Sequence, residues 1–232
     1  MALTDKLSAV ADAIRNKTGK TGSMTLDQMP AQINSITTVS GTNKTAEIAA
    51  KTITEITEAD LNGISGIAAE AFKNCYNLTT VSFPRPLISI GSQAFYRCTA
   101  LVNLNFKKPS WELEPCYPEI CSEAFAYCTG LTKVKLAQTA PYTNNWLYIR
   151  SRAFYYCSNL KKIYIPVNVK IAKEAFWGCS ALTDIYYEGS LSDWKYNTGI
   201  TGDSYGNWDE YFPTGSAAKI TVHFEAVPSE LD

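Results

Sequence analysis

Five cysteines recur at one position of a repeated sequence pattern: Cys75, Cys98, Cys128, Cys157 and Cys179. Thiols are metal ligands and nucleophiles, so their spacing bears directly on function. A zinc site requires thiolates that converge on one ion at about 2.3 Å, usually from pairs separated by two to four residues. Cysteines placed once per repeat form a line that cannot surround an ion. We therefore interpret them as small buried apolar residues and predict no metal site.

The remaining reactive side chains lack the partners that catalysis requires. The single histidine, His223, lies in an alternating strand pattern, and no residue near it in the sequence supplies the thiol and orienting group of a nucleophilic pair. Cys116 and Cys121 lie outside the repeat position. Their spacing is compatible with a disulfide, a reactive thiol or two solvated thiols.

Three carboxylates, Glu112, Glu114 and Glu119, cluster in one predicted loop. A glycosidase needs two carboxyl groups held about 5 to 10 Å apart, and a solvated acidic loop is the simpler interpretation. The phosphate-binding and nucleophile motifs GxxxxGK[ST], GxGxxG and GxSxG do not occur. We therefore predict a non-enzymatic protein without a cofactor, and a glycan-active enzyme is the remote alternative.

Composition narrows the classes of partner and location. The formal net charge of -1 gives no basic field that would favour nucleic acid or anionic lipid. No run of about 18 apolar residues occurs, so we predict no membrane span. The N-terminal stretch is amphipathic and lacks the apolar core and cleavage site of a signal peptide. Hydrophobic residues make up 46% of the chain, which is enough to bury a core.

A repeat unit accounts for the cysteine spacing. Each unit begins with Ile and has Ala four, Phe five, Cys eight and Leu eleven residues later, then apolar residues at fourteen and sixteen. The units begin at Ile67, Ile90, Ile120, Ile149 and Ile171. This periodicity predicts a solenoid in which each turn buries its apolar side against the next. The Leu-x-x-Val-x-Phe part predicts a short strand that pairs in parallel with its neighbours, and the Ala-Phe part a short helical turn on the opposite side.

The predicted organisation has four parts. We assign 1–37 to a small N-terminal helical module, 38–63 to a linker and N-terminal cap, 64–189 to the repeats and 190–232 to a C-terminal β cap. The last cap is required because an uncovered turn would expose an apolar face and an unpaired strand edge. The N-terminal helices are too small to be stable alone, so we expect them to mediate attachment or oligomerisation.

The unit Ile-x-x-x-Ala-Phe-x-x-Cys-x-x-Leu-x-x-Val-x-Phe-Pro resembles the BspA-like class of bacterial leucine-rich repeats. The resemblance implies an α/β repeat fold, a leucine-rich-repeat solenoid of about five turns of 22 to 30 residues with parallel strands on one face. The stretches 186–194 and 220–224 are similar to the ends of such arrays from gut bacteria. The stretch LSAVADAIRNKTG, with the later MTLDQMP, is similar to segments that open phage or prophage tail-associated proteins.

Two insertions form the first candidate binding surface. The second and third units carry extra residues after their strands, 107–119 and 137–148, which leave the solenoid at equivalent points. Their aromatic residues are Trp111, Tyr117, Tyr142, Trp146 and Tyr148. Such rings offer contact area to a protein or to the apolar face of a sugar. The alternative is that they tuck back and cover the solenoid.

The outward side of the strands is the second candidate surface, because leucine-rich repeat proteins commonly bind through it. Its basic and aromatic positions are Lys133, Lys135, Lys162, Tyr164 and Tyr186. A solvated β surface without a partner is the alternative interpretation. The function that we expect is recognition of a protein or glycan at a cell or virion surface. Both a phage or prophage tail-associated protein and a secreted bacterial surface adhesin fit this expectation.

Overall fold

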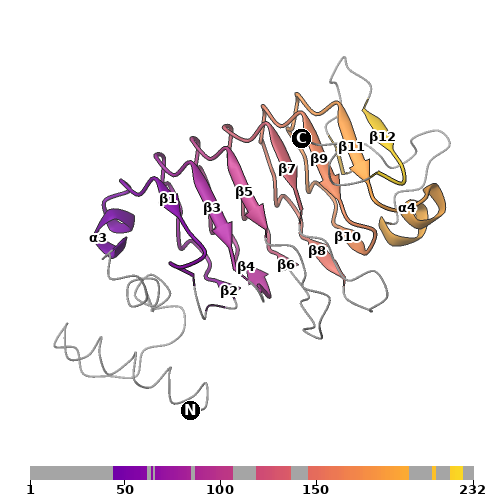
Figure 1. Ribbon diagram of the computed structural model, residues 1–232. Helices are drawn as coiled ribbons and strands as arrows, with labels where there is room; N and C mark the ends of the chain where they lie inside the picture. Colours follow the sequence, from indigo (N-terminus) through magenta and orange to yellow (C-terminus); the bar gives the residue numbers. More distant parts are fainter. Residues whose placement is uncertain are drawn as a thin grey trace, which may run out of the picture.

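The computed structural model describes residues 44–61, 64, 66–84, 87–106, 119–136, 146–198, 211–212 and 220–226. The chain winds as a solenoid whose strands lie side by side along its length (Figure 1). The α/β leucine-rich-repeat fold predicted from the repeat is confirmed. The predicted N-terminal helical module, 1–37, lies outside the described residues.

One series of strands forms one side of the solenoid, which we name the strand face. They are β1 (Glu55–Ile56), β3 (Thr80–Phe83), β5 (Asn103–Phe106), β7 (Lys133–Lys135), β9 (Lys162–Ile165), β11 (Asp184–Tyr187) and β12 (Thr221–His223). Every pair among them is parallel. The pairing aligns equivalent unit positions: Val81 lies opposite Leu104, and Ile163 opposite Ile185. The apolar positions of the unit therefore set the register.

The sheet that forms the strand face is divided into two parts. One part has the order β1-β3-β5 and the other β12-β11-β9-β7, so β5 and β7 are neighbours without a ladder between them. The break lies where the first insertion leaves the solenoid, after Phe106. The predicted parallel pairing of each strand with its neighbours therefore holds on this face except between β5 and β7.

A second, continuous sheet forms where each turn begins. Its strands are β2 (Gly66–Ile67), β4 (Ser89–Ile90), β6 (Glu119–Ile120), β8 (Leu147–Ile149) and β10 (Val169–Ile171). They pair in parallel in the order β10-β8-β6-β4-β2, and the leading Ile of each unit lies opposite that of the next. The predicted unit boundaries are confirmed by this register.

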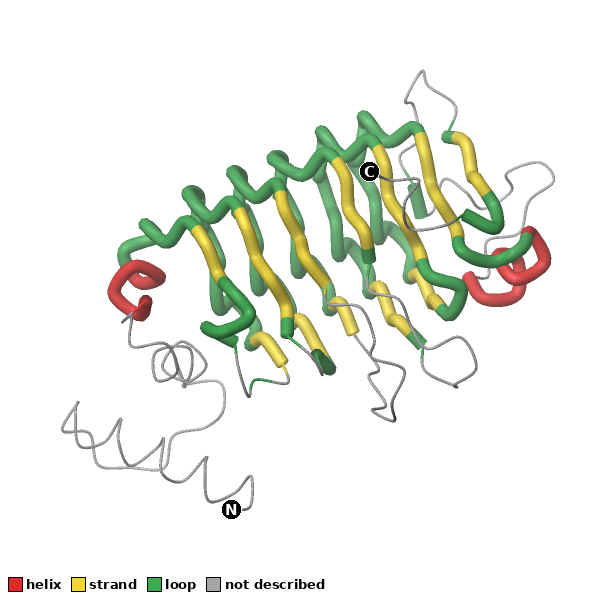
Figure 2. Tube along the Cα trace, viewed as in Figure 1, coloured by secondary structure: helices red, strands yellow, loops and turns green. Residues whose placement is uncertain are grey.

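The Ala-Phe segments are turns, so the prediction of a short helical turn there is wrong (Figure 2). Each contains two residues with positive φ, at three and seven residues after the leading Ile. These pairs are Glu70 and Asn74, Gln93 and Arg97, Glu123 and Tyr127, Arg152 and Tyr156, and Glu174 and Gly178. In a helix, the N–H groups would bond within the segment. The residues with positive φ instead direct alternate N–H groups toward the next turn of the solenoid. Thus Phe72 N donates to Ala94 O at 2.7 Å.

A column of phenylalanine rings forms the centre of the core. Consecutive rings stack nearly face to face, with centroid distances from 5.1 to 5.4 Å. The rings belong to Phe72, Phe95, Phe125, Phe154, Phe176 and Phe212. The five repeat cysteines are also fully buried and free, as predicted from the spacing. Because every turn supplies one ring and one thiol, the core is continuous along the solenoid.

The two ends of the column are covered differently. At the N-terminal end, helix α3 (Lys44–Ala49) begins inside the segment predicted as a linker, and its Ile48 is buried in the core. At the C-terminal end, helix α4 (Leu191–Thr198) packs Trp194 edge-on against Tyr187. Phe212 and β12 add one further layer of turn and strand. The predicted β cap therefore also contains a helix.

The start of α4 is fixed by a capping box. Ser190 Oγ and Asp193 Oδ2 exchange hydrogen bonds with each other's backbone N–H, at 3.2 and 2.8 Å. These bonds from Ser190 lower the pKa of Asp193. In the described part of the chain, neither α3 nor α4 has the length and hydropathy that a membrane-crossing helix would need.

Candidate functional site

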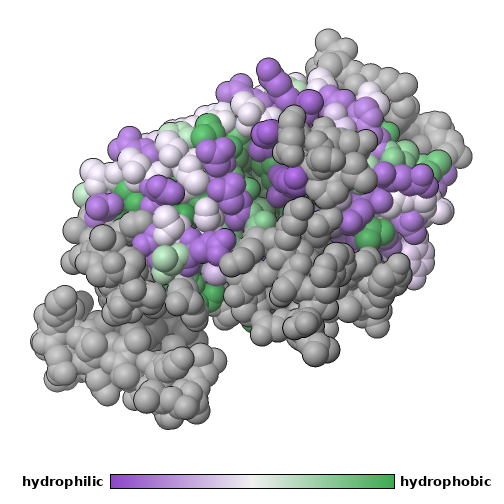
Figure 3. All heavy atoms as spheres, in the orientation of Figure 1, coloured by the Kyte–Doolittle hydropathy of each residue, from purple (hydrophilic) through white to green (hydrophobic). Residues whose placement is uncertain are grey.

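The strand face begins with a ladder of polar side chains between β3 and β5. Asn103 Nδ2 donates to Thr80 Oγ1 at 3.3 Å, and Asn105 Nδ2 donates to Ser82 Oγ at 3.2 Å. Hydrophilic residues predominate over the described part of this face (Figure 3). These bonds between amides on β5 and hydroxyl groups on β3 hold the surface in a fixed arrangement.

Three lysines gather on the next two strands of the face. Lys133 lies directly opposite Lys162 in the register of β7 and β9, and Lys135 lies two residues further along β7. Lys133 is exposed, and the other two are half-buried. The sequence placed all three on the outward side, and the structure brings them together on adjacent strands.

Tyr164 does not belong to the accessible strand face, and its assignment there is wrong. Its side chain is fully buried and packs with Ala226 and the partly buried Tyr186. The segment that follows β12 covers it, because Glu225 N donates to Gly189 O and Ala226 N donates to Tyr187 O, both at 3.0 Å. Tyr164 does lie at an outward position of β9, as predicted, but the segment after β12 covers that position.

Tyr186 lies in a cluster at the C-terminal end of the face. Its ring stacks on His223 at 4.5 Å with an interplanar angle of 12°, and Lys162 Nζ lies 5.9 Å from its centroid. His223 Nε2 is 2.8 Å from Asp184 Oδ1. The expectation that no group orients His223 is therefore wrong. The pairing of β11 with β12, which the sequence does not reveal, brings Asp184 beside it.

The pKa of Asp184 is lowered by this arrangement. Partial burial acts to raise the pKa, but the hydrogen bonds from His223 and Thr183 lower it by more. The repeat cysteines are buried in the core, so none of these thiols is available to the Asp184–His223 pair. The pair therefore orients an imidazole on the surface, and the repeat cysteines do not supply it with the nucleophile of a Cys–His site.

Two of the five predicted insertion aromatics are described. Trp146 is half-buried, with Lys170 Nζ 4.4 Å from its ring centroid. Tyr148, in the middle of β8, faces the guanidinium of Arg150 at 5.0 Å. Lys170 also lies 5.7 Å from the ring of Tyr196 on α4, whose side chain is 80% exposed. Sequence analysis missed Tyr196 because a helix was not expected there.

The other three aromatics, Trp111, Tyr117 and Tyr142, lie outside the described residues. The flanks of the insertions are described: the first runs between β5 and β6 and the second between β7 and β8. Because β6 pairs with β8, the two insertions return to adjacent strands.

The acidic and thiol groups near the first insertion are only partly described. Glu119 is the first residue of β6 and not a loop residue, and it pairs with Arg150 Nε at 2.5 Å. Glu112, Glu114 and Cys116 lie outside the described residues. Cys121 is a free, half-buried thiol whose pKa is raised by burial and by the Glu119 charge. Among the described residues no group of three His, Cys, Asp or Glu side chains could hold a metal ion.

Three features define the structure as a leucine-rich-repeat solenoid. They are stacked parallel strands, turns that contain residues with positive φ, and one central ring per turn. The chain matches the family described as BspA type leucine rich repeat region, with six copies over residues 65–198. It therefore belongs to the BspA-type leucine-rich repeat family. No curated protein matches the chain.

Two solved structures are similar to the chain. One is a leucine rich cell surface protein from Faecalibacterium prausnitzii, 31% identical over 64% of this chain, with a TM-score of 0.50. The other is a leucine-rich repeat protein from Bacteroides ovatus, 21% identical over 74% of this chain, with a TM-score of 0.43. The alignments cover 35% and 40% of those two chains, so this chain spans well under half of either.

Proposed function

We propose that the protein is a non-enzymatic recognition protein that acts at a cell surface and binds a protein or glycan partner through the strand face. The similarity to the Faecalibacterium prausnitzii cell surface protein supports the location. The observation that carries the binding surface is the row of Lys133, Lys135 and Lys162 on two paired strands. Positive side chains on a rigid surface complement the charge of an acidic partner.

The architecture suits recognition because the surface is rigid before the partner arrives. Parallel strands hold successive side chains roughly 4.8 Å apart. The Asn103–Thr80 and Asn105–Ser82 hydrogen bonds fix the neighbouring part of the face. A preorganised surface loses little conformational entropy on binding. The aromatic residues of the two insertions extend this surface in our proposal: Trp111, Tyr117, Tyr142, Trp146 and Tyr148.

Two charge-matched double variants test the lysine row. Lys133→Glu/Lys162→Glu reverses the charge on the strand face. Lys51→Glu/Lys161→Glu makes the same change in net charge outside the strands of this face, in the turn after α3 and at the residue before β9. Labelled wild-type protein is applied to a glycan array and to an array of extracellular proteins. We expect the first variant to lose binding to the ligands of the wild-type protein and the second variant to retain it. No ligand on either array, or equal loss by both variants, would overturn the proposal.

The insertion aromatics are tested on the same glycan array. A Trp111→Ala/Trp146→Ala variant should reduce the signal of every glycan that the wild-type protein binds. Unchanged binding would remove the insertions from the proposed surface and leave the lysine row as the part under test.

The N-terminal segment supplies the proposed attachment to a larger assembly. Its similarity to the opening segments of phage or prophage tail-associated proteins supports this part, and a secreted adhesin is the alternative. Size-exclusion chromatography with light scattering compares the full chain with a chain that lacks 1–37. An oligomeric full chain and a monomeric truncated chain would support attachment through this segment. Two monomers would count against it.

A further inference from the structure

Four tyrosines form a continuous row on the turns, away from the strand face. Tyr96 contacts Tyr127 at a centroid distance of 5.4 Å, and Tyr127 stacks on Tyr156 at 5.5 Å and 14°. Tyr155 contacts Tyr156 edge-on at 4.6 Å. The side chain of Tyr156 is 43% exposed. The row, which we name the tyrosine row, therefore presents rings to solvent across three successive turns.

The row is kept at a cost in backbone conformation. Arg97, Tyr127 and Tyr156 occupy the seventh position after the leading Ile and have φ values of 58°, 61° and 54°. A residue with a side chain in this region costs roughly 1 to 2 kcal/mol. Gly178 holds the same position in the last unit, so the backbone does not require a side chain there.

Gly178 also makes room for the row. A Cβ atom at this residue would lie 2.8 Å from ring atoms of Tyr156. The missing side chain therefore allows the Tyr156 ring to lie against the backbone of the next turn. The glycine of the last unit therefore fits the Tyr156 ring of the preceding turn.

Arg97 places a positive charge within the row. Its guanidinium carbon lies 5.4 Å from the centroid of Tyr96 and 5.6 Å from that of Tyr127. In the part of the chain that the structure describes, no carboxylate lies within ion-pair distance of it. A guanidinium held by two rings keeps its N–H donors for a planar anion such as a carboxylate.

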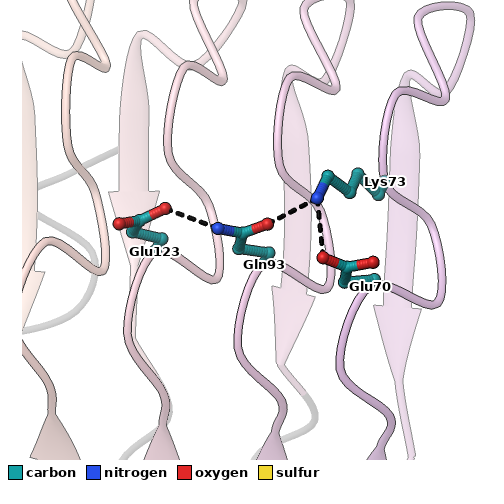
Figure 4. A network of polar contacts seen from close by, with 4 residues as sticks. All are labelled: Glu70, Lys73, Gln93 and Glu123. Carbon is teal, nitrogen blue, oxygen red and sulfur yellow. Dashed lines mark hydrogen bonds and ion pairs between the residues drawn. The ribbon is translucent and has the colours of Figure 1, made fainter.

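The charged groups beside the row take part in contacts within and between turns. Lys73 Nζ lies 2.6 Å from both Glu70 Oε1 and Gln93 Oε1, and Gln93 Nε2 donates to Glu123 Oε2 at 2.8 Å (Figure 4). On the C-terminal side, Arg152 Nε pairs with Glu174 Oε2 at 2.6 Å. These residues join successive turns. Among the described residues, Arg97 makes no ion pair or side-chain hydrogen bond of this kind.

The hydroxyl groups of the row add hydrogen-bonding capacity. The pKa of Tyr127 is raised by burial and then by the neighbouring phenols of Tyr96, Tyr155 and Tyr156. Four phenol groups therefore lie close enough to influence one another. Each can donate and accept a hydrogen bond.

We propose that the tyrosine row with Arg97 binds an acidic glycan, that is, a polysaccharide whose sugars carry carboxylates. The aromatic faces suit the apolar side of a sugar ring, the phenols suit its hydroxyls, and Arg97 suits its carboxylate. A row of rings continuing from turn to turn matches an extended chain. A folded protein partner would instead anchor side chains in a buried pocket. This site is separate from the strand face and does not depend on the proposed function of that face.

Affinity gel electrophoresis tests the proposal with three carboxylated polysaccharides, namely polygalacturonate, alginate and hyaluronan, and with neutral dextran. We expect at least one of the three to retard the wild-type protein, and dextran to have no effect. Arg97→Gln should weaken that binding by at least about tenfold, because it removes a charge-assisted hydrogen bond. Tyr127→Phe should weaken it less, because the ring stack remains.

Two control variants separate this site from other charges. Arg150→Gln removes a guanidinium that is already paired with Glu119 and lies against Tyr148, outside the tyrosine row. Lys133→Glu/Lys162→Glu alters only the strand face. Both should bind the acidic glycan as the wild type does. Circular dichroism melts are recorded to check that each variant is folded.

Four results would overturn the proposal. The first is no retardation by any of the carboxylated polysaccharides. The second is unchanged binding by folded Arg97→Gln. The third is equal competition by poly-glutamate, which would assign the row to acidic peptides. Loss of glycan binding in the strand-face variant alone would also exclude the tyrosine row and would support the strand face instead.

Discussion

The Sγ atom of Cys98 donates a hydrogen bond to the backbone carbonyl oxygen of Phe72, 3.1 Å away in the preceding turn. Each later repeat cysteine makes the same bond at 3.1 or 3.2 Å. The pairs are Cys128 with Phe95, Cys157 with Phe125 and Cys179 with Phe154. A thiol is a weak donor but small enough for this position. The recurring cysteine therefore also satisfies a buried carbonyl, which alanine could not do.

Removing one such thiol should reduce stability. Cys128→Ala leaves the Phe95 carbonyl without this donor and opens a small cavity in the core. We expect a loss of about 1 to 3 kcal/mol in the free energy of unfolding. Cys121→Ala is the matched control, because that thiol is half-buried and outside the column. Urea titration of both variants measures the difference, and equal small effects would contradict the role of the bond.

The central ring of the phenylalanine column should be among the most costly to truncate. Phe125 stacks on Phe95 at 5.1 Å and on Phe154 at 5.3 Å and is fully buried. We expect Phe125→Ala to lower the free energy of unfolding by about 3 to 5 kcal/mol. Phe106→Ala, at a partly buried ring, should cost clearly less. Similar values for the two variants in denaturant titrations would argue against a continuous column.

Gly178 should not tolerate alanine while Tyr156 is present. Its φ of 79° disfavours a side chain, and the added Cβ would meet the Tyr156 ring. We expect Gly178→Ala to cost at least about 1 kcal/mol from the backbone conformation alone. In the Gly178→Ala/Tyr156→Ala double variant the steric part should disappear, so the two effects should be less than additive. A thermal-melt cycle with full additivity would rule out the contact.

The Asp184–His223 pair should stabilise the fold in a pH-dependent manner. Because the pKa of Asp184 in the folded protein lies below its ordinary value of 3.8, its contribution is present above that pH. The contribution is lost as the pH falls through the lowered pKa. Asp184→Asn should therefore be slightly less stable than the wild type at pH 6, by less than about 1 kcal/mol for an exposed pair. Thermal melts at decreasing pH below 3.8 should show this difference shrinking, and a growing difference would contradict the assignment.

The repeat spacing predicted the fold and the register because apolar positions decide which residues face the core. Val81, Val134 and Ile185 lie inward as the period requires. The turn geometry could not be predicted in the same way. Its left-handed positions carry residues such as Gln93, Arg97 and Tyr127, which have no turn preference of their own, and only Asn74 and Gly178 give the usual signal. Stacking between turns imposes that conformation.

Contacts between distant segments account for the errors at the candidate sites. Tyr164 has an outward register, but Ala226 covers it, and no periodicity encodes the path of the chain after β12. His223 meets Asp184 only because β12 adds to the sheet. The tyrosine row was missed because the turns were expected to be helical, and a helix would have separated these side chains. The Glu-Tyr-Phe sequence at 210–212 resembles the Glu-Ala-Phe of the units and could have indicated the further layer.

Counting reactive thiols in the native protein tests the central claim most directly. Cys116→Ser/Cys121→Ser leaves only the five cysteines of the column. Burial raises the pKa of the Cys75, Cys98, Cys128 and Cys179 thiols, so they are both shielded and protonated. With an aromatic disulfide reagent we expect no labelling of this variant in buffer and all five thiols to react in guanidinium chloride. Rapid labelling of any of the five in the folded protein would contradict the buried column.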